Sequence, residues 1–143
     1  AYEGIRGEER RLSLSEVDPI EAIRRLIAFS WNYHLAHPEF LTLLNSATLH
    51  RARHLKKSTG IARMNSQLVQ MLAEVLERGH KAGIFRAGVD PVQLYISIAA
   101  LSYFYLSNKH TLSAVFGRNL MTPKARNERL SHICDVIHGY VSA

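Results

Sequence analysis

The sequence has little of several residue types that mark whole classes of protein. A single cysteine, Cys134, excludes an internal disulfide framework and suits a reducing, cytoplasmic location. Eight glycines and four prolines in 143 residues exclude a fibrous or low-complexity chain. The first eighteen residues are dense in charge and contain no apolar run, so no signal peptide is expected there. The remaining composition, 47% hydrophobic and 21% charged, predicts one globular domain.

Acidic residues are absent from a long central segment. No Asp or Glu stands between Phe40 and Ala73, whereas the segment holds several cations, most of them in "HRARHLKKS" at residues 50–58. These charges have two interpretations: a phosphate-binding patch, or a solvated helix end where cations complement the helix dipole. The second is favoured, because no aromatic or glycine-rich pattern accompanies the charges. The net charge of +6 favours anionic partners in general and names none of them.

Motifs for catalysis and metal binding are also missing. The chain contains no G-x-S-x-G, no G-x-x-x-x-G-K and no G-x-G-x-x-G. Glu77 and His80 match the E-x-x-H spacing of di-iron bundles, but those bundles need a second copy of the motif and further carboxylates. His50 and His54 lie four residues apart without an obvious third ligand. We therefore expect no enzyme activity, no cofactor and no metal site.

Apolar residues recur with helical spacing, and no run alternates with period two for long enough to predict a strand. The clearest helical face is Ile61, Met64, Leu68, Met71 and Val75. The pattern predicts an all-α domain of five or six helices. Helix starts are predicted where a capping residue precedes proline, and stops at glycines: Asp18-Pro19 with Glu21, Asp90-Pro91 and Thr122-Pro123 for starts, His37-Pro38 for a break, and Gly60, Gly83, Gly88 and Gly117 for stops.

The segment from Pro91 to Asn108 carries no charged side chain. As a helix it is apolar around most of its circumference, so it must be covered on more than one side. A membrane span is not expected, because Gln, Ser, Asn and aromatic residues dilute the run. We therefore expect one side to face the chain's own core and the other to face a second copy in a symmetric dimer.

The string "KAGIFRAGVDPVQLYISIAALSYF" at residues 81–104 resembles the C-terminal regulatory domain of TetR-family transcriptional regulators. In that family a G-x-F-R turn and an Asp-Pro helix start commonly lead into the first of two dimerization helices. "HPEFLTLL" at 37–44 and the closing "RLSHICDVIHGYV" at 129–141 are consistent with this resemblance. The opening "AYEGIRGEERRL" resembles the end of the helix that joins the DNA-binding head to this domain.

The resemblance implies a helical bundle that dimerizes through its last two long helices. Residues 1–143 would form a single effector-binding and dimerization domain, with residues 1–14 as the end of the connecting helix. The N-terminal helix-turn-helix of the family is absent from this sequence, so DNA binding is expected only through that missing part. The implied mechanism is ligand-gated: a small molecule enters the helical core and residues 1–12 then shift, with repression as the family's usual mode.

Two sets of site residues follow from the helix faces. The residues expected in the homodimer interface are Leu94, Ile98, Leu101, Tyr105, Leu130, Ile133, Ile137 and Tyr140. The residues expected around an unidentified small-molecule effector are Trp31, His34, Leu44, Met64, Leu68, Met71, Tyr103 and Phe104. His34 or Tyr103 would orient a polar group, and the others would form apolar walls. The alternative is a structural or interaction bundle without a pocket, in which these side chains are plain core packing.

Overall fold

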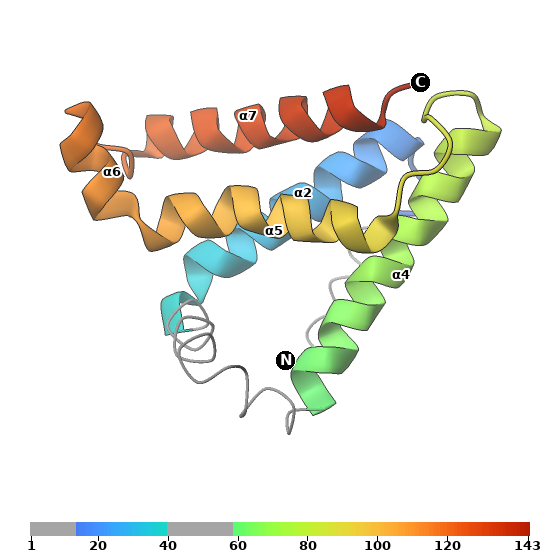
Figure 1. The fold of residues 1–143 in the computed structure, drawn as a ribbon, viewed down its shortest axis with the longest axis horizontal. Helices are drawn as coiled ribbons and strands as arrows, with labels where there is room; N and C mark the ends of the chain where they lie inside the picture. Colours follow the sequence, from blue (N-terminus) through green and yellow to red (C-terminus); the bar gives the residue numbers. More distant parts are fainter. Residues whose placement is uncertain (1–13, 40–58) are drawn as a thin grey trace.

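The computed structural model describes residues 14–39 and 59–143, with side chains from residue 66 onward in the second range. Five helices lie within these ranges: α2 (Pro19–Ala36), α4 (Thr59–Lys81), α5 (Pro91–Ser107), α6 (Lys109–Phe116) and α7 (Pro123–Val141). Figure 1 shows α5 and α7 side by side, with α2 behind them, α4 inclined across one end and α6 at the other. The predicted all-α architecture is confirmed.

The three predicted Asp-Pro or Thr-Pro starts are the starts of α2, α5 and α7. Asp18 accepts a hydrogen bond from the backbone N–H of Glu21 at 3.0 Å, and Asp90 accepts one from Val92 N–H at 2.8 Å. Thr122 accepts from Ala125 N–H at 3.1 Å. Each cap satisfies a backbone donor that the first helical turn leaves unpaired, and the following proline needs no such partner.

The four glycines predicted to end helices occupy different positions in the structure. Gly83 and Gly117 have positive φ just beyond the ends of α4 and α6, as helix C-termini often require, and Gly88 has positive φ in the turn before α5. Gly60 was expected to end a helix, but it lies in the first turn of α4. A glycine tolerates an internal helical position at modest cost, so its presence alone did not mark a boundary.

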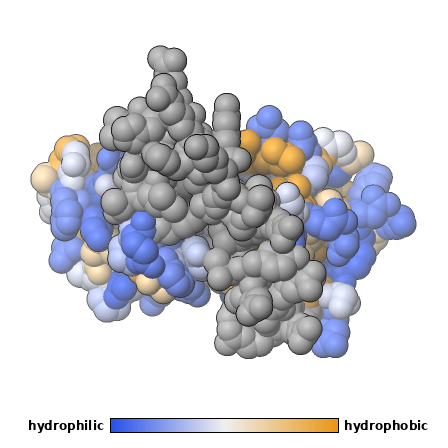
Figure 2. Space-filling model, turned by 90° about the horizontal axis from the view of Figure 1, so that it is seen from below, coloured by the Kyte–Doolittle hydropathy of each residue, from blue (hydrophilic) through white to orange (hydrophobic). Residues whose placement is uncertain are grey.

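Helix α2 is the centre of the core. It packs against α4, α5 and α7, and it buries Ile23, Ile27 and Trp31 almost completely. Because α5 also packs against α4 and α7, the inner side of α5 is covered by three helices. In the space-filling view of Figure 2, hydrophilic residues are frequent at both ends of the molecule, and hydrophobic residues reach the surface in a patch at the upper right and in a smaller one at the left edge.

The connection between α4 and α5 is tied to the end of the chain. Phe85 is fully buried against Gly79, where an added Cβ would lie 2.0 Å from the phenyl ring. The backbone N–H of Arg86 donates to the carbonyl of Val141 at 2.9 Å, and Ala143 donates to Ile84 at 3.0 Å. These bonds hold the end of α7 beside the connection that leads into α5.

Candidate functional site

Helix α5 has two apolar faces with different surroundings. Leu94, Ile98 and Tyr105 are 1%, 2% and 8% exposed and belong to the core. Ile96 and Phe104 lie on the opposite face and are 53% and 59% exposed. Residues 96, 100 and 104 follow each other at four-residue spacing, so they form one continuous strip along the helix. A large apolar strip left open in one chain marks an interaction surface.

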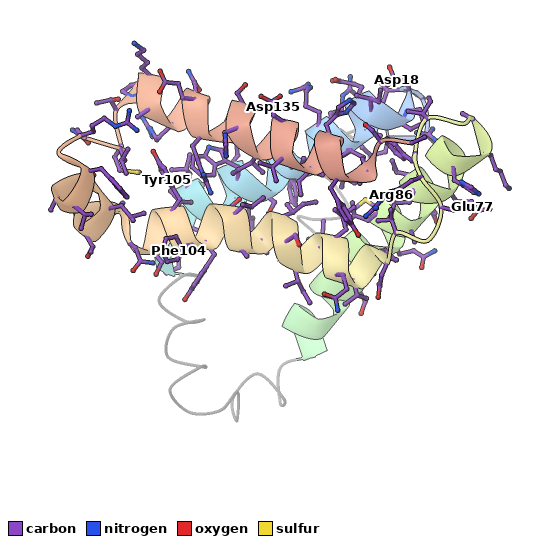
Figure 3. All side chains as sticks on the ribbon, turned by 45° about the horizontal axis from the view of Figure 1, so that its top comes forward. Asp18, Glu77, Arg86, Phe104, Tyr105 and Asp135 are labelled. Carbon is purple, nitrogen blue, oxygen red and sulfur yellow. The ribbon has the colours of Figure 1, made fainter. Side chains whose placement is uncertain are left out.

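A groove of about 460 Å³ runs between α5 and α7 along this strip. Helix α7 contributes exposed Val136 and Tyr140, at 42% and 46%, to its other wall. Figure 3 shows the two helices side by side, with Tyr105 between them. The groove is lined by Ser97, Ala100, Leu101, Phe104, Arg129, Val136, Ile137 and Tyr140. It can accept apolar side chains from a partner of matching shape.

Arg129 is the cation that lines this groove. Its guanidinium donates to the Leu101 carbonyl at 2.8 Å and lies 5.2 Å from the centre of the Tyr105 ring. The Tyr105 hydroxyl donates in turn to the Leu120 carbonyl. Burial lowers the pKa of the Arg129 guanidinium, although arginine stays charged at neutral pH. The groove is therefore apolar with one fixed positive charge.

The residues predicted for the dimer interface lie in different surroundings in the structure. Leu101 and Tyr140 line the groove and are partly exposed, whereas Ile137 borders the groove but is itself 2% exposed and belongs to the core. Leu130 is half-buried against the core. The other four are corrected, because their side chains lie in the chain's own core, where a partner cannot reach them: Leu94, Ile98, Tyr105 and Ile133.

The residues that sequence reasoning chose on α5 lie mostly on its buried side, because no charged residue marks the outer face of this helix. Ile96, Ala100, Val136 and Arg129 were not among the predicted interface residues, and Phe104 was placed in the effector set. A signal was present, since four-residue spacing continues from Val92 through Ile96 and Ala100 to Phe104. The same spacing relates Leu94, Ile98 and Ser102, so spacing alone could not tell the outer face from the inner one.

Four of the predicted effector residues lie on the facing helices α2 and α4. Trp31 and His34 are 2% and 6% exposed on α2, and Leu68 and Met71 are 7% and 5% exposed on α4. The Trp31 ring meets the edge of the Tyr105 ring with centroids 5.7 Å apart. We call Trp31, His34, Leu68 and Met71 the α2/α4 wall. It has the composition of many ligand sites, apolar with one polar group.

The electrostatics of this wall centre on His34. Burial lowers the pKa of its imidazole, because a charged ring is poorly solvated among apolar neighbours. The neutral ring has one donor and one acceptor nitrogen, so it could orient a polar group of a bound molecule. The neighbouring Tyr33 ring stacks on His37 with centroids 4.3 Å apart. The pKa of the Tyr95 hydroxyl is raised, mainly by burial.

The other predicted effector residues have different outcomes. Tyr103 is half-buried on α5. Leu44 and the side chain of Met64 lie outside the described residues, as do His50, His54 and the segment 50–58. Phe104 is corrected: it lines the groove between α5 and α7 and is open to solvent there. Phe104 follows Tyr103 in the sequence, so its side chain lies about 100° further around the helix and on a different face.

Glu77 and His80 are both exposed, and Glu77 forms an ion pair with Lys81 at 3.3 Å. Within residues 14–39 and 66–143, no group of three or more His, Cys, Asp or Glu side chains is placed to hold a metal ion. None of the helices in the described ranges combines the length and apolar character needed to cross a membrane.

Residues 19–137 match the family described as "Tetracyclin repressor-like, C-terminal domain". The chain belongs to this family of regulator domains. It is also 36% identical over 135 residues to the HTH-type transcriptional repressor NicS of Pseudomonas putida. That match covers 94% of this chain and 64% of NicS, so the chain spans somewhat less than two thirds of this relative.

Proposed function

We propose that this chain is the effector-binding and dimerization domain of a ligand-responsive transcriptional repressor. The observation that carries the proposal is the pair of apolar faces on α5: one is buried by α2, α4 and α7, and the other is open along the groove. A chain that leaves such a strip uncovered gains free energy by pairing it with a complementary surface. In a homodimer the same strip on the second copy supplies that surface.

The residues proposed for the dimer interface are the outer strip of α5 at residues 96, 100 and 104 and the exposed residues of the groove. Phe104 and Tyr140 are large enough to fill a partner's groove, and burying a side chain such as Phe104 stabilises a complex by roughly 1.5–3 kcal/mol. Arg129 supplies a hydrogen-bond donor at the same surface. Two-fold symmetry brings each of these contacts twice, so a single substitution acts on both halves of the interface.

The effector is proposed to bind against the α2/α4 wall, where Trp31 meets Tyr105 of α5. The neutral, buried imidazole of His34 supports a ligand with at least one hydrogen-bonding group. Trp31, Leu68 and Met71 support an apolar or aromatic body for the same ligand. DNA binding is proposed only for a parent protein with a helix-turn-helix, which NicS has according to its name as an HTH-type repressor.

A structural bundle without a pocket is the alternative, and a ligand screen separates the two. The chain is melted with panels of aromatic acids, aromatic amines and nucleobases. A ligand at 100 times its Kd raises the free energy of unfolding by about 2.7 kcal/mol. The effector proposal expects one class to raise Tm in the wild type and to lose most of that effect in His34→Phe. His80→Phe, at an exposed histidine of α4, is the control and keeps the shift.

No shift from any class would favour the packed bundle. A shift that survives His34→Phe unchanged would place the ligand elsewhere. The dimer is tested separately by light scattering, so the effector proposal and the dimer proposal can each fail without the other.

A further inference from the structure

Arg78 joins the end of α4 to the turn that precedes α2. Its Nη1 donates to the Ser15 carbonyl at 3.0 Å, and its Nη2 donates to the carbonyls of Leu14 and Val17 at 2.9 and 3.0 Å. The bonded residues lie 61 to 64 positions apart in sequence. We call Arg78 and these three carbonyls the Arg78 cluster.

This arrangement fixes the turn in more than one direction. A planar guanidinium holds its donors in a rigid fork, so three carbonyls bound together restrict both the position and the rotation of the turn. Leu14 is 9% exposed and belongs to the hydrophobic core. On the other side, Asp18 caps α2. The turn therefore lies between the core, the cap of α2 and the guanidinium of α4.

The same helix carries half of the α2/α4 wall. Met71 precedes Arg78 by seven residues, about 10 Å or two turns along α4. Between them α4 is continuous and buries Leu72 and Val75. A rotation or translation of α4 at Met71 is thus carried to the guanidinium. Because hydrogen bonds weaken steeply once distance and angle leave a narrow range, the turn must follow the guanidinium or lose its bonds.

We propose that Arg78 is the positioning residue that couples α4 to the chain entering the domain at residues 14–17. Its regulatory meaning rests on the proposed function, since α4 is half of the proposed effector wall. A ligand that moves α4 changes the position of this turn through the Arg78 cluster. A displacement of residues 14–17 is the local change that the proposed regulator would use.

The first test measures backbone hydrogen exchange in the peptide that spans residues 14–22, relative to a peptide from the centre of α7. This peptide holds the turn and the Glu21 and Ala22 amides, which bond to Asp18 beside it. We expect Arg78→Ala to speed exchange near residues 14–17 about tenfold, while α7 changes little. Lys81→Ala is the matched control, because Lys81 stands one turn later in α4 and forms, among the described residues, an ion pair with Glu77. We expect it to leave both peptides unchanged.

A merely stabilising arginine would raise exchange in both peptides together, and that result would overturn the proposal. If Arg78→Ala does not fold, Arg78→Lys decides the question. A lysine keeps the charge but lacks the planar fork, so we expect local exchange to rise about threefold. Exchange at the wild-type rate in Arg78→Lys would equally overturn it.

The second test is a double-mutant cycle with Met71→Ala, which loosens the packing of α4 without any ligand. We expect Met71→Ala to speed exchange in the peptide of residues 14–22, relative to α7, in the wild type and to add little in Arg78→Ala. Equal and additive effects would show that α4 does not act through Arg78. Because no ligand is used, failure here is distinct from failure of the effector screen.

Discussion

Replacing either Ile98 or Ile96 by glutamate tests the two faces of α5 with the same chemical change. The positions are two residues apart, about 200° around the helix. Ile98 is 2% exposed in the core, and Ile96 is 53% exposed beside the groove. Glutamate is a good helix former, so helix propensity does not account for any loss at either site.

The expected magnitudes differ widely. At Ile98 the change removes about 1.5–3 kcal/mol of apolar burial and leaves a carboxyl group without a suitable partner, which adds a further 1–3 kcal/mol. The total is a large part of the roughly 5–15 kcal/mol that holds a domain folded, so we expect Tm to fall by more than about 10 °C or folding to fail. At Ile96 we expect the protomer to lose less than about 1 kcal/mol.

The assay is thermal and urea unfolding followed by circular dichroism over a range of protein concentrations. Concentration matters because dimer formation itself raises Tm by mass action. We expect Ile96→Glu to unfold like the wild type at high dilution, yet to dimerize at least about tenfold more weakly. Val115→Glu, at a 68% exposed residue of α6 outside the groove, is the control and changes neither property. A stable Ile98→Glu beside an unfolded Ile96→Glu would refute the assignment of the faces.

Three further substitutions test the packing and the buried polar groups by the same unfolding assay. Gly79→Ala forces a Cβ against the ring of Phe85 and should lower the free energy of unfolding by about 1–3 kcal/mol. In Gly139→Ala the added Cβ meets nothing within 4 Å, so this change should raise the free energy of unfolding by about 0.5–1 kcal/mol. Equal effects of the two substitutions would contradict the contact between Gly79 and Phe85. Burial lowers the pKa of His34, so below pH 6.5 the unfolded chain binds more protons than the folded chain, and stability falls as the pH drops. His34→Phe should reduce this dependence of stability on pH. An unchanged dependence would contradict the burial of His34 as its cause. Tyr105→Phe removes the hydroxyl hydrogen bond to the α6–α7 connection and should cost about 1–2 kcal/mol, and no loss of stability would place that bond in doubt.

The helix starts were predictable because their causes are local. Asp18, Asp90 and Thr122 each bond a backbone N–H two or three residues away, and the proline beside each of them already has a helical φ. Helical spacing also predicted the burial of Trp31 and Met71, since the apolar side of each helix faces the core. Spacing could not tell whether such a buried face surrounds a cavity, because packing and ligand walls use the same residues.

The functional surfaces were harder to predict because they depend on contacts between distant parts of the chain. An uncharged helix such as α5 offers no polar mark for its outer face, so only its neighbours decide that Ile98 is covered and Phe104 is open. The bonds of Arg78 to a turn more than sixty residues earlier, and of Arg129 to Leu101, follow from the tertiary arrangement. No spacing rule within one helix predicts them.

The most direct measurement of the central claim is the mass of the chain in solution, by light scattering at micromolar concentration, for the wild type and Phe104→Glu. We predict twice the 16.2 kDa of one chain for the wild type, and a folded particle of 16.2 kDa for the variant. A wild type that stays at 16.2 kDa at every concentration, or a variant that dimerizes as tightly as the wild type, would contradict the pairing of the outer face of α5.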